Sequence, residues 1–508
     1  MHRRNGAAIG CRAFVVVSMV ALTACGGGGG NDGGSPANPG ISHAPSANSA
    51  RQCAAPRPAG AVDLLGRPYN DRQGSVDSEK RWVGAWHNET YLWYRESPDR
   101  GPQAHASAVS YFSSLRTTAT TASGRAKDQF HFTYDTAEYQ AMSQGGVSMG
   151  YGFTISVSSP TPPRRVVVAY TDPGTPAAAA GIPRGAEILS VDGVDVVNDG
   201  SASGVAVLNA GLAPSRPGTH TFMLRNTPTS PTRLVSLNAS AVTLVPVQNV
   251  RTLPEPYQQV GYLLFNDHIA TSEPALITAI QQLALAGVTD LVIDLRYNGG
   301  GYLGIASELA YMVAGPSRTQ NRTFEELIFN DKNPFGLTAS ERNTPFHSTS
   351  QGFSGAAGQP LPTLNLGRVY VLVSGDTCSA SESLVNGLRG VGVQVVLVGT
   401  STCGKPYGFL PTDNCSTTYF TVQFRGVNHL GQGDYADGFA PNCTVADDFT
   451  HALGDPAEAS LSLALGHRAT GTWVRAVGRA GPRAAQPAVE GGSLMRSVLR
   501  ENRLYRER

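Results

Sequence analysis

The stretch LVIDLRYNGGGYLGIASELAYMV, residues 291–313, contains the pattern that decides the fold. It begins with a mostly apolar run of strand length, and a turn with three consecutive glycines separates this run from a helical pattern at 302–313. The same alternation continues on both sides, which predicts a layered α/β domain over residues 246–470. Further strands are expected at 261–265, 369–373 and 394–398, and further helices at 272–286 and 380–388.

Regions of different character flank this domain. Residues 56–140 show a helical pattern with aromatic anchors such as Trp82 and Trp86, which predicts a small N-terminal helical domain. Residues 141–245 change to short β-rich runs that Pro and Gly turns interrupt. Residues 471–508 carry eight arginines against three glutamates, and we expect them to form a flexible, basic tail.

Composition excludes several classes of protein. The chain has 508 residues, and its 39 basic and 38 acidic residues give a formal net charge of +1. This near balance argues against a nucleic-acid binder, whose footprint is strongly basic. A hydrophobic content of 41% is that of an ordinary globular protein, neither wholly disordered nor a polytopic membrane protein.

The first 25 residues have the form of a secretory signal. Three arginines precede an apolar run at 13–21, which is much shorter than the roughly 20 residues of a membrane span. The run closes on Leu22-Thr23-Ala24-Cys25, which resembles the lipobox of bacterial lipoproteins, in which the cysteine is acylated. This resemblance implies a lipid anchor at Cys25 and the periplasmic side of the outer membrane, with residues 26–55 as a Gly/Ser/Pro tether. An ordinary signal peptide cut nearby is the alternative.

The cysteines fit an oxidising compartment. The chain has seven, and five of them remain once Cys11 and Cys25 are assigned to the signal peptide and to lipid attachment. Some of these five should form disulfides in the periplasm. The sequence contains neither CxxC nor HExxH, so we expect no metal site and no cofactor.

Two blocks in the β-rich region resemble a PDZ domain. The first is Gly150-Tyr151-Gly152-Phe153, and the second covers 176–193 and ends in Asp-Gly. In a PDZ domain a loop of this kind captures a C-terminal carboxylate, because glycine lets consecutive backbone N–H groups turn toward an anion. The resemblance implies that Gly150, Tyr151, Gly152 and Phe153 bind substrate C-termini.

Three further blocks, in order along the chain, resemble the C-terminal processing (tail-specific) serine proteases. They are DLRYNGGG at 294–301, TCSASE at 377–382 and GTSTCGK at 399–405. The resemblance covers roughly residues 140–465 and implies a crotonase-like layered α/β protease domain with the PDZ domain inserted upstream.

This resemblance also implies the catalytic roles. Ser379 is the expected nucleophile and Lys405 its general base, with the backbone N–H groups of Ala380 and Gly301 as the oxyanion hole. A serine hydroxyl needs a proton acceptor to become a good nucleophile, and a lysine can serve once burial lowers its pKa by up to ~3–5 units. The residues around Lys405 permit this because no carboxylate lies within seven positions on either side.

Two details accompany the implied dyad. Relatives often carry a glutamine four residues after the lysine, whereas this chain has Phe409, so the third catalytic residue stays open. Because Ser379 and Lys405 must meet, we expect a disulfide between their neighbours Cys378 and Cys403, with Cys415–Cys443 as a second bond and Cys53 left over.

We therefore predict a lipid-anchored periplasmic serine endopeptidase that acts on proteins or peptides with free C-termini. A non-catalytic peptide- or ligand-binding lipoprotein on the same fold is the alternative. The GxxxxGK pattern at 399–405 also resembles a phosphate loop, but Pro406 follows where such loops have Ser or Thr. The segment 316–360 is expected to be either a lid of the cleft or a surface insertion.

Overall fold

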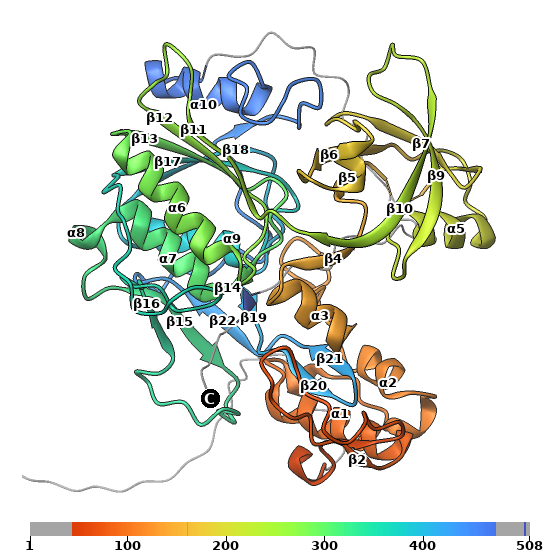
Figure 1. Cartoon of the computed structure of the whole chain (residues 1–508). Coiled ribbons are helices and arrows are strands. Elements are labelled where there is room, and N and C mark those ends of the chain that lie inside the picture. The colour runs from red at the N-terminus through yellow and green to blue at the C-terminus, as the bar shows by residue number, and fades with distance from the viewer. Residues whose placement is uncertain (1–42, 160, 474–501, 504–508) are drawn as a thin grey trace, which may run out of the picture.

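The computed structural model describes residues 43–159, 161–473 and 502–503 (Figure 1). The predicted signal peptide, the lipobox with Cys25 and most of the basic tail lie outside the described residues. None of the helices in the described ranges is long and apolar enough to cross a membrane. The described chain forms a large α/β domain, a β-rich domain beside it and an N-terminal region below both in the view of Figure 1.

The α/β domain is built on a six-stranded sheet. Its strands are parallel except for the first, which runs antiparallel to its neighbour. The inner strands are buried over nearly their whole length, because helices cover both faces and the strands are therefore apolar on both faces. In spatial order the strands are β11 (Val247–Thr252), β12 (Val260–Phe265), β13 (Asp290–Asp294), β17 (Arg368–Val373), β18 (Gln394–Gly399) and β23 (Cys443–Thr444).

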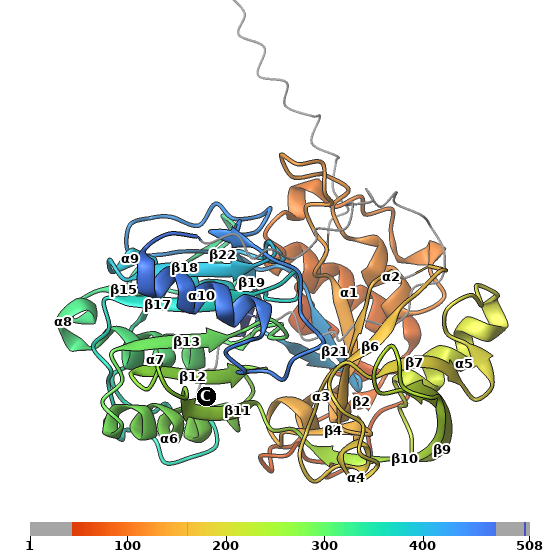
Figure 2. The same ribbon diagram turned by 90° about the horizontal axis from the view of Figure 1, so that it is seen from above.

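Successive residues of β12 face two different layers. Leu263 packs with helices on one face, and Leu264 packs with the C-terminal helix α10 on the other. The predicted strands and helices of this domain are present, with ends shifted by at most two residues. The helices are α6 (Ser272–Leu285), α7 (Leu303–Ala314) and α9 (Ala380–Gly390) on the first face, and α10 (Ala459–Thr470) on the second. Figures 1 and 2 show α10 and the helices α6, α7 and α9 on opposite faces of the sheet.

A second, four-stranded sheet packs under α9. Phe324 and Phe424 of this sheet share one buried cluster with Leu384 of α9. The segment 316–360, expected to be a lid or a surface insertion, contributes two strands and α8 (Pro316–Thr319) to this region. The order of strands is β16 (Asn343–Pro345), β15 (Thr323–Phe329), β22 (Phe424–Val427) and β19 (Tyr407–Gly408).

The β-rich domain is a largely antiparallel sheet with two short helices. Phe222, Leu224 and Val168 lie in a buried core that is separate from the cores of the α/β domain. The helices are α4 (Pro176–Ala179) and α5 (Ala202–Leu212). The sheet order is β4 (Val147–Gly150), β10 (Arg233–Thr243), β9 (Gly218–Arg225), β7 (Glu187–Val191), β6 (Val166–Thr171) and β5 (Phe153–Val157), with β8 (Val194–Asp195) paired to β7.

The N-terminal region is completed by a hairpin from the α/β domain. Its helices α1 (Val76–Thr90) and α2 (Ala108–Ser114) bury Trp82 and Trp86 against Tyr419, which belongs to that hairpin. The hairpin strands β20 (Thr412–Asn414) and β21 (Thr417–Phe420) pair with each other, and β21 also pairs with β3 (Phe132–Asp135). The helix α3 (Thr136–Ser143) leads from β3 to the β-rich domain.

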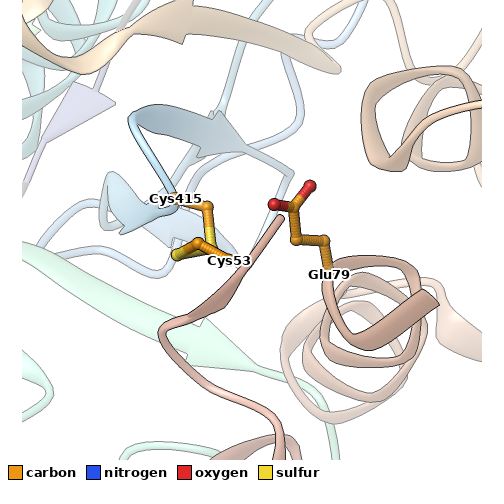
Figure 3. A group of neighbouring side chains, drawn as sticks. All are labelled: Cys53, Glu79 and Cys415. Carbon is orange, nitrogen blue, oxygen red and sulfur yellow. A yellow bond between two sulfur atoms is a disulfide. The ribbon is translucent and has the colours of Figure 1, made fainter. Parts of the chain in front are cut away.

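A disulfide ties the same hairpin to the start of the described chain. Cys53 of β1 (Gln52–Cys53) is bonded to Cys415 at the turn of the hairpin, beside Glu79 of α1 (Figure 3). The predicted Cys415–Cys443 bond is therefore wrong, and Cys443 is a free thiol. The composition of residues 26–55 indicates a tether that does not pack, and for this reason it leaves Cys53 without a predicted partner.

Residues 43–55 in fact pack against α1. Ser46 donates hydrogen bonds from its backbone N–H and its hydroxyl to the Glu89 carboxylate, at 2.8 and 2.6 Å. The backbone N–H of Ala54 donates to Glu79 at 2.8 Å. The folded N-terminal region thus begins before residue 56, the boundary expected from composition.

Two buried carboxyl groups hold the loop after β16. Glu273 at the start of α6 and Glu308 in α7 both accept the backbone N–H of Gln351, at 2.7 and 2.8 Å. Burial, together with the charge and hydrogen bond of Glu273, raises the pKa of Glu308 to about 9. Glu308 is therefore protonated at neutral pH and can share its proton with Glu273.

This pair predicts a fall in stability as pH rises. Between its ordinary pKa and about 9, Glu308 binds a proton in the folded chain and not in the unfolded chain, so the free energy of unfolding decreases with pH. Glu308→Gln keeps the shape and donor of the protonated acid and removes this dependence. We expect its Tm to exceed that of the parent by roughly 2–5 °C at pH 8 and to match it at pH 5.

Differential scanning fluorimetry from pH 5 to 8.5 measures this difference. Glu326→Gln, in β15 and only partly buried, is the control and should follow the parent at every pH. A constant offset between Glu308→Gln and the parent across this range would contradict the assignment.

Candidate active site

Ser379 lies in a strained turn between β17 and α9. Its φ of 62° and ψ of −117° are rare for any residue except glycine, and its side chain is fully buried. The turn is held against the 294–301 segment, because Cys378 donates its backbone N–H to Asn298 O at 3.1 Å and Thr377 donates its hydroxyl to Leu295 O at 2.8 Å. This backbone geometry resembles the strained strand-to-helix turn that presents a nucleophilic serine.

Ala380 is the first residue of α9, so its backbone N–H is one of the N–H groups at the helix N-terminus that have no partner within the helix. Gly301 of β14 (Gly301–Tyr302) pairs with His268, but through its neighbours' atoms: His268 donates to Gly300 O and Tyr302 donates to His268 O. In a parallel bridge of this kind the N–H of Gly301 points to the opposite side.

That opposite side receives a strand. β24 (Asn502–Arg503) pairs in parallel with β14, with Asn502 opposite Gly301 (the short dark-blue strand beside β14 in Figure 1). Gly301 also cannot be replaced, because its φ is 138° and a Cβ there would lie 2.3 Å from His268 O. The backbone of this position is thus paired with an extended segment of the same chain.

Lys405 follows β18 in a segment that runs beside the serine turn. The backbone N–H of Cys403 donates to Thr377 O at 3.0 Å, and a disulfide joins Cys403 to Cys378, the bond expected from the sequence. Lys405 is fully buried. The structure therefore brings the 377–382 block and the 399–405 block together.

Glu382 connects these two blocks and had no assigned role in the sequence analysis. Its buried carboxylate accepts the backbone N–H of Ser379 at 3.0 Å, of Gly404 at 2.9 Å and of Lys405 at 2.8 Å, and the hydroxyl of Thr402 at 2.5 Å. Burial raises the pKa of Glu382, although these hydrogen bonds oppose the shift. The spacing Ser-x-x-Glu at a helix start is a capping-box signature and was the available signal.

Phe409 occupies the place where relatives often have a glutamine. It is fully buried, and the centroid of its ring lies 4.2 Å from the Lys405 Nζ atom. An amide at this position would offer a hydrogen bond, whereas the phenylalanine offers the face of a ring. The replacement of the expected glutamine by Phe409 therefore changes the direct surroundings of the Lys405 amine.

The Gly150–Phe153 turn joins β4 to β5 in the β-rich domain. Gly152 has a φ of 80°, and a Cβ there would lie 2.3 Å from the side chain of Thr175. The Tyr151 hydroxyl donates to Gly211 O near the end of α5 at 2.9 Å, which fixes the turn against that helix. Within the described residues β5 pairs only with β6, so its other edge is available for strand addition.

An arginine connects this domain to the candidate catalytic site. Arg184 donates to the Tyr297 hydroxyl at 2.5 Å and to Asp447 Oδ1 at 2.6 Å. Arg296 also binds Asp447, at 2.7 Å. Tyr297 directly precedes Asn298, whose side chain accepts the backbone N–H of Gly300 at 3.0 Å. The hydrogen bond between Arg184 and Tyr297 therefore links the β-rich domain to the glycine turn.

Comparisons with known proteins identify both domains. Residues 259–425 match the model of peptidase family S41, and residues 142–208 match the PDZ domain model. The carboxyl-terminal-processing protease of Picosynechococcus sp. is 30% identical over 52% of this chain and 56% of its own length. The chloroplastic C-terminal processing peptidase of Tetradesmus obliquus is 29% identical over 47% of this chain and 48% of its own length. The chain spans about half the length of these curated relatives.

The fold agrees with these matches. The crystal structure of an S41 protease from Bacteroides fragilis is similar to this chain, with a TM-score of 0.58 and 24% sequence identity. The matched region covers 77% of this chain and 97% of the Bacteroides fragilis chain. The layered α/β protease fold with a PDZ domain, expected from the motif blocks, is confirmed.

The role of Glu382 generates a prediction about stability. Glu382→Gln replaces one acceptor oxygen by an amide N–H₂ group and leaves buried donors of the two segments without a partner, so we expect the free energy of unfolding to fall by about 1–3 kcal/mol. Urea denaturation at pH 7 measures the change. The exposed Glu341→Gln serves as the control, and an unchanged midpoint for Glu382→Gln would contradict the connecting role.

Proposed function

We propose that this chain, with its S41 peptidase domain and PDZ domain, is a serine endopeptidase that cleaves protein substrates through an acyl-enzyme. The observation that carries the proposal is the joining of a strained serine turn to a fully buried lysine by Glu382 and the Cys378–Cys403 bond. Burial disfavours the charged form of a lysine, and a general base must be in its neutral form to accept a proton.

The reaction takes two steps. The Ser379 Oγ atom attacks the substrate carbonyl carbon while its proton moves to Lys405 Nζ, and the resulting ammonium then protonates the leaving amine as the C–N bond breaks. In the second step a water molecule attacks the ester carbonyl, Lys405 takes a proton from that water, and Ser379 leaves with it. The fragment with the new amino terminus is released after the first step, and the fragment with the new carboxyl terminus after the second.

The N–H groups of Ala380 and Gly301 are the proposed oxyanion hole. The start of α9 supplies the first donor, and the second points to the side of β14 where β24 pairs. Preorganised donors of this kind typically contribute 10²–10³-fold in rate each. The pairing of β24 supports binding of the substrate backbone as an added strand beside Gly301.

We place the enzyme in the bacterial envelope, lipid-anchored through Cys25 on the periplasmic side of the outer membrane. Two disulfides favour an oxidising compartment, which agrees with this location. The PDZ domain is proposed to bind substrate C-termini through the Gly150–Phe153 turn and the edge of β5. No nucleic acid and no cofactor enter this proposal.

A second candidate function, a non-catalytic peptide-binding lipoprotein, is favoured by a single observation. Phe409 stands where relatives often carry an amide near the lysine, so the third catalytic group of those relatives is missing here. The dyad variants below separate the two functions.

Ser379→Ala and Lys405→Ala should each abolish cleavage of a fluorescently labelled, unfolded protein by the chain that begins at residue 26. We expect a loss of at least ~10³-fold for either change, because the two groups act as one unit. Ser113→Ala and Lys332→Ala, both outside the site, are the controls and should retain activity. An inactive parent, or activity that survives Ser379→Ala, would favour the non-catalytic function.

Gly152→Ala should weaken recognition of free C-termini, because its Cβ would collide with Thr175 and displace the turn. The parent is expected to prefer a peptide with a free carboxylate over its C-terminal amide by roughly 10–100-fold, the range for a charge-assisted hydrogen bond. Fluorescence anisotropy with both peptides measures this ratio, which should approach one in Gly152→Ala.

Gly466→Ala in α10, where an added Cβ meets no atom within 4 Å, is the matched control. A ratio that stays high in Gly152→Ala would place carboxylate capture elsewhere.

A further inference from the structure

Two phenylalanine rings enclose the amine of Lys405. The Nζ atom lies 4.2 Å from the ring centroid of Phe409 and 5.0 Å from that of Phe130. Both rings are buried, with Phe130 4% and Phe409 0% exposed. Neither ring has a part in the reaction as described so far, although both are within the range of a cation–π interaction.

Phe130 reaches the lysine from the N-terminal region. The fully buried carboxylate of Asp128 accepts the backbone N–H of Phe130 at 2.9 Å and the hydroxyl of Tyr91 at 2.7 Å. A third contact lies alongside, because Arg125 donates to Cys403 O at 2.9 Å. The segment that carries Phe130 is thus fixed both to α1 and to the lysine segment.

Phe409 is held by aromatic side chains of the neighbouring strands. Its ring lies 5.9 Å from Phe132 of β3 and 5.2 Å from Phe420 of β21, both at steep interplanar angles of 77° and 72°. These edge-to-face contacts restrict the ring, so its face stays directed at Lys405. Both rings therefore depend on the sheet that joins the N-terminal region to the hairpin.

We propose that Phe130 and Phe409 are positioning residues for the general base. They keep water from the neutral amine before the reaction, and they present the electron-rich faces of their rings to the ammonium that forms when Lys405 accepts the proton of Ser379. The proposal rests on the proposed function. It makes the N-terminal region part of the catalytic environment, because Phe130 belongs to that region.

Titratable groups also lie on the segments that pack around the Lys405 segment, so pH profiles must be compared between variants that keep all of these groups. All of them stay in place when a phenylalanine is replaced, so a shift that follows such a replacement reports on the rings. They are Glu382 from α9, Arg125, Asp128 and His131 from the N-terminal region, Tyr407 from β19 and Tyr435 from the loop after β22.

Leucine and glutamine replacements give opposite expectations. Phe130→Leu and Phe409→Leu keep water out but remove the ring face, so the ammonium loses stabilisation and the acidic limb of the kcat profile should move to lower pH. In Phe409→Gln the amide oxygen accepts from the ammonium, and the limb should move to higher pH. We expect kcat of the leucine variants to fall by roughly 3–30-fold with KM within about twofold.

A second readout does not depend on activity. The chain has four lysines, at positions 80, 127, 332 and 405, so ¹³Cε-lysine labelling yields a simple NMR spectrum in which Lys405→Arg assigns the signal. The titration midpoint of Lys405 should fall in both leucine variants, also in a Ser379→Ala background. Phe346→Leu, a buried ring that packs on Phe324, is the control for a general loss of packing.

The outcomes separate the two proposals. Leucine variants whose NMR titration and kcat profile match the parent would overturn the role of the rings and leave the dyad intact. A shifted lysine titration in a chain that does not cleave protein would support the rings and overturn the proposed function. An equal shift in Phe346→Leu would also overturn the role of the rings.

Discussion

The buried carboxylate of Glu382 is the interaction on which the site depends. A single side chain accepts hydrogen bonds from the backbone of Ser379 and from the backbone of Gly404 and Lys405, so it fixes the Ser379 turn and the Lys405 segment relative to each other. Such a group is costly to bury, and its cost is offset only because several donors converge on it. The Cys378–Cys403 disulfide joins the same two segments covalently. Two independent constraints therefore fix the position of the Ser379 turn relative to the Lys405 segment.

The hairpin at 412–420 makes the N-terminal region and the peptidase domain one unit. Tyr419 packs in the core with α1 and α2, and Phe420 packs on Phe132 and on Phe409, whose ring faces Lys405. The aromatic residues of the N-terminal region, expected to be the core of a separate small domain, are thus continuous with the surroundings of the site. Phe130 and Phe409 are far apart in the sequence, yet their rings face the same amine, that of Lys405.

Local patterns in the sequence predicted what depends on local geometry. The strand–glycine–helix pattern at 291–313 and the three motif blocks identified the layered fold and the family whose model matches residues 259–425, because alternation and turn chemistry act within a few residues. The pairing of Cys415 could not be found in this way, since its partner lies in a segment whose composition indicates a tether. The contact between Phe130 and Lys405 could not be predicted either, because only tertiary packing brings the two residues together. Glu382 was within the quoted block, but its connecting role needs the positions of both segments.

The Cys53–Cys415 bond has a consequence for biosynthesis. With a sequence separation of 362 residues, it closes a covalent ring that contains the whole PDZ domain and most of the peptidase domain. At a synthesis rate of 5–20 residues per second, the thiol of Cys53 waits roughly 20–70 s for its partner to be made. Cys378 and Cys403 are made before Cys415 and are only 25 positions apart, so they can pair first. The first cysteine of the folded chain is therefore among the last to be oxidised, and until then it must be kept from the wrong thiol.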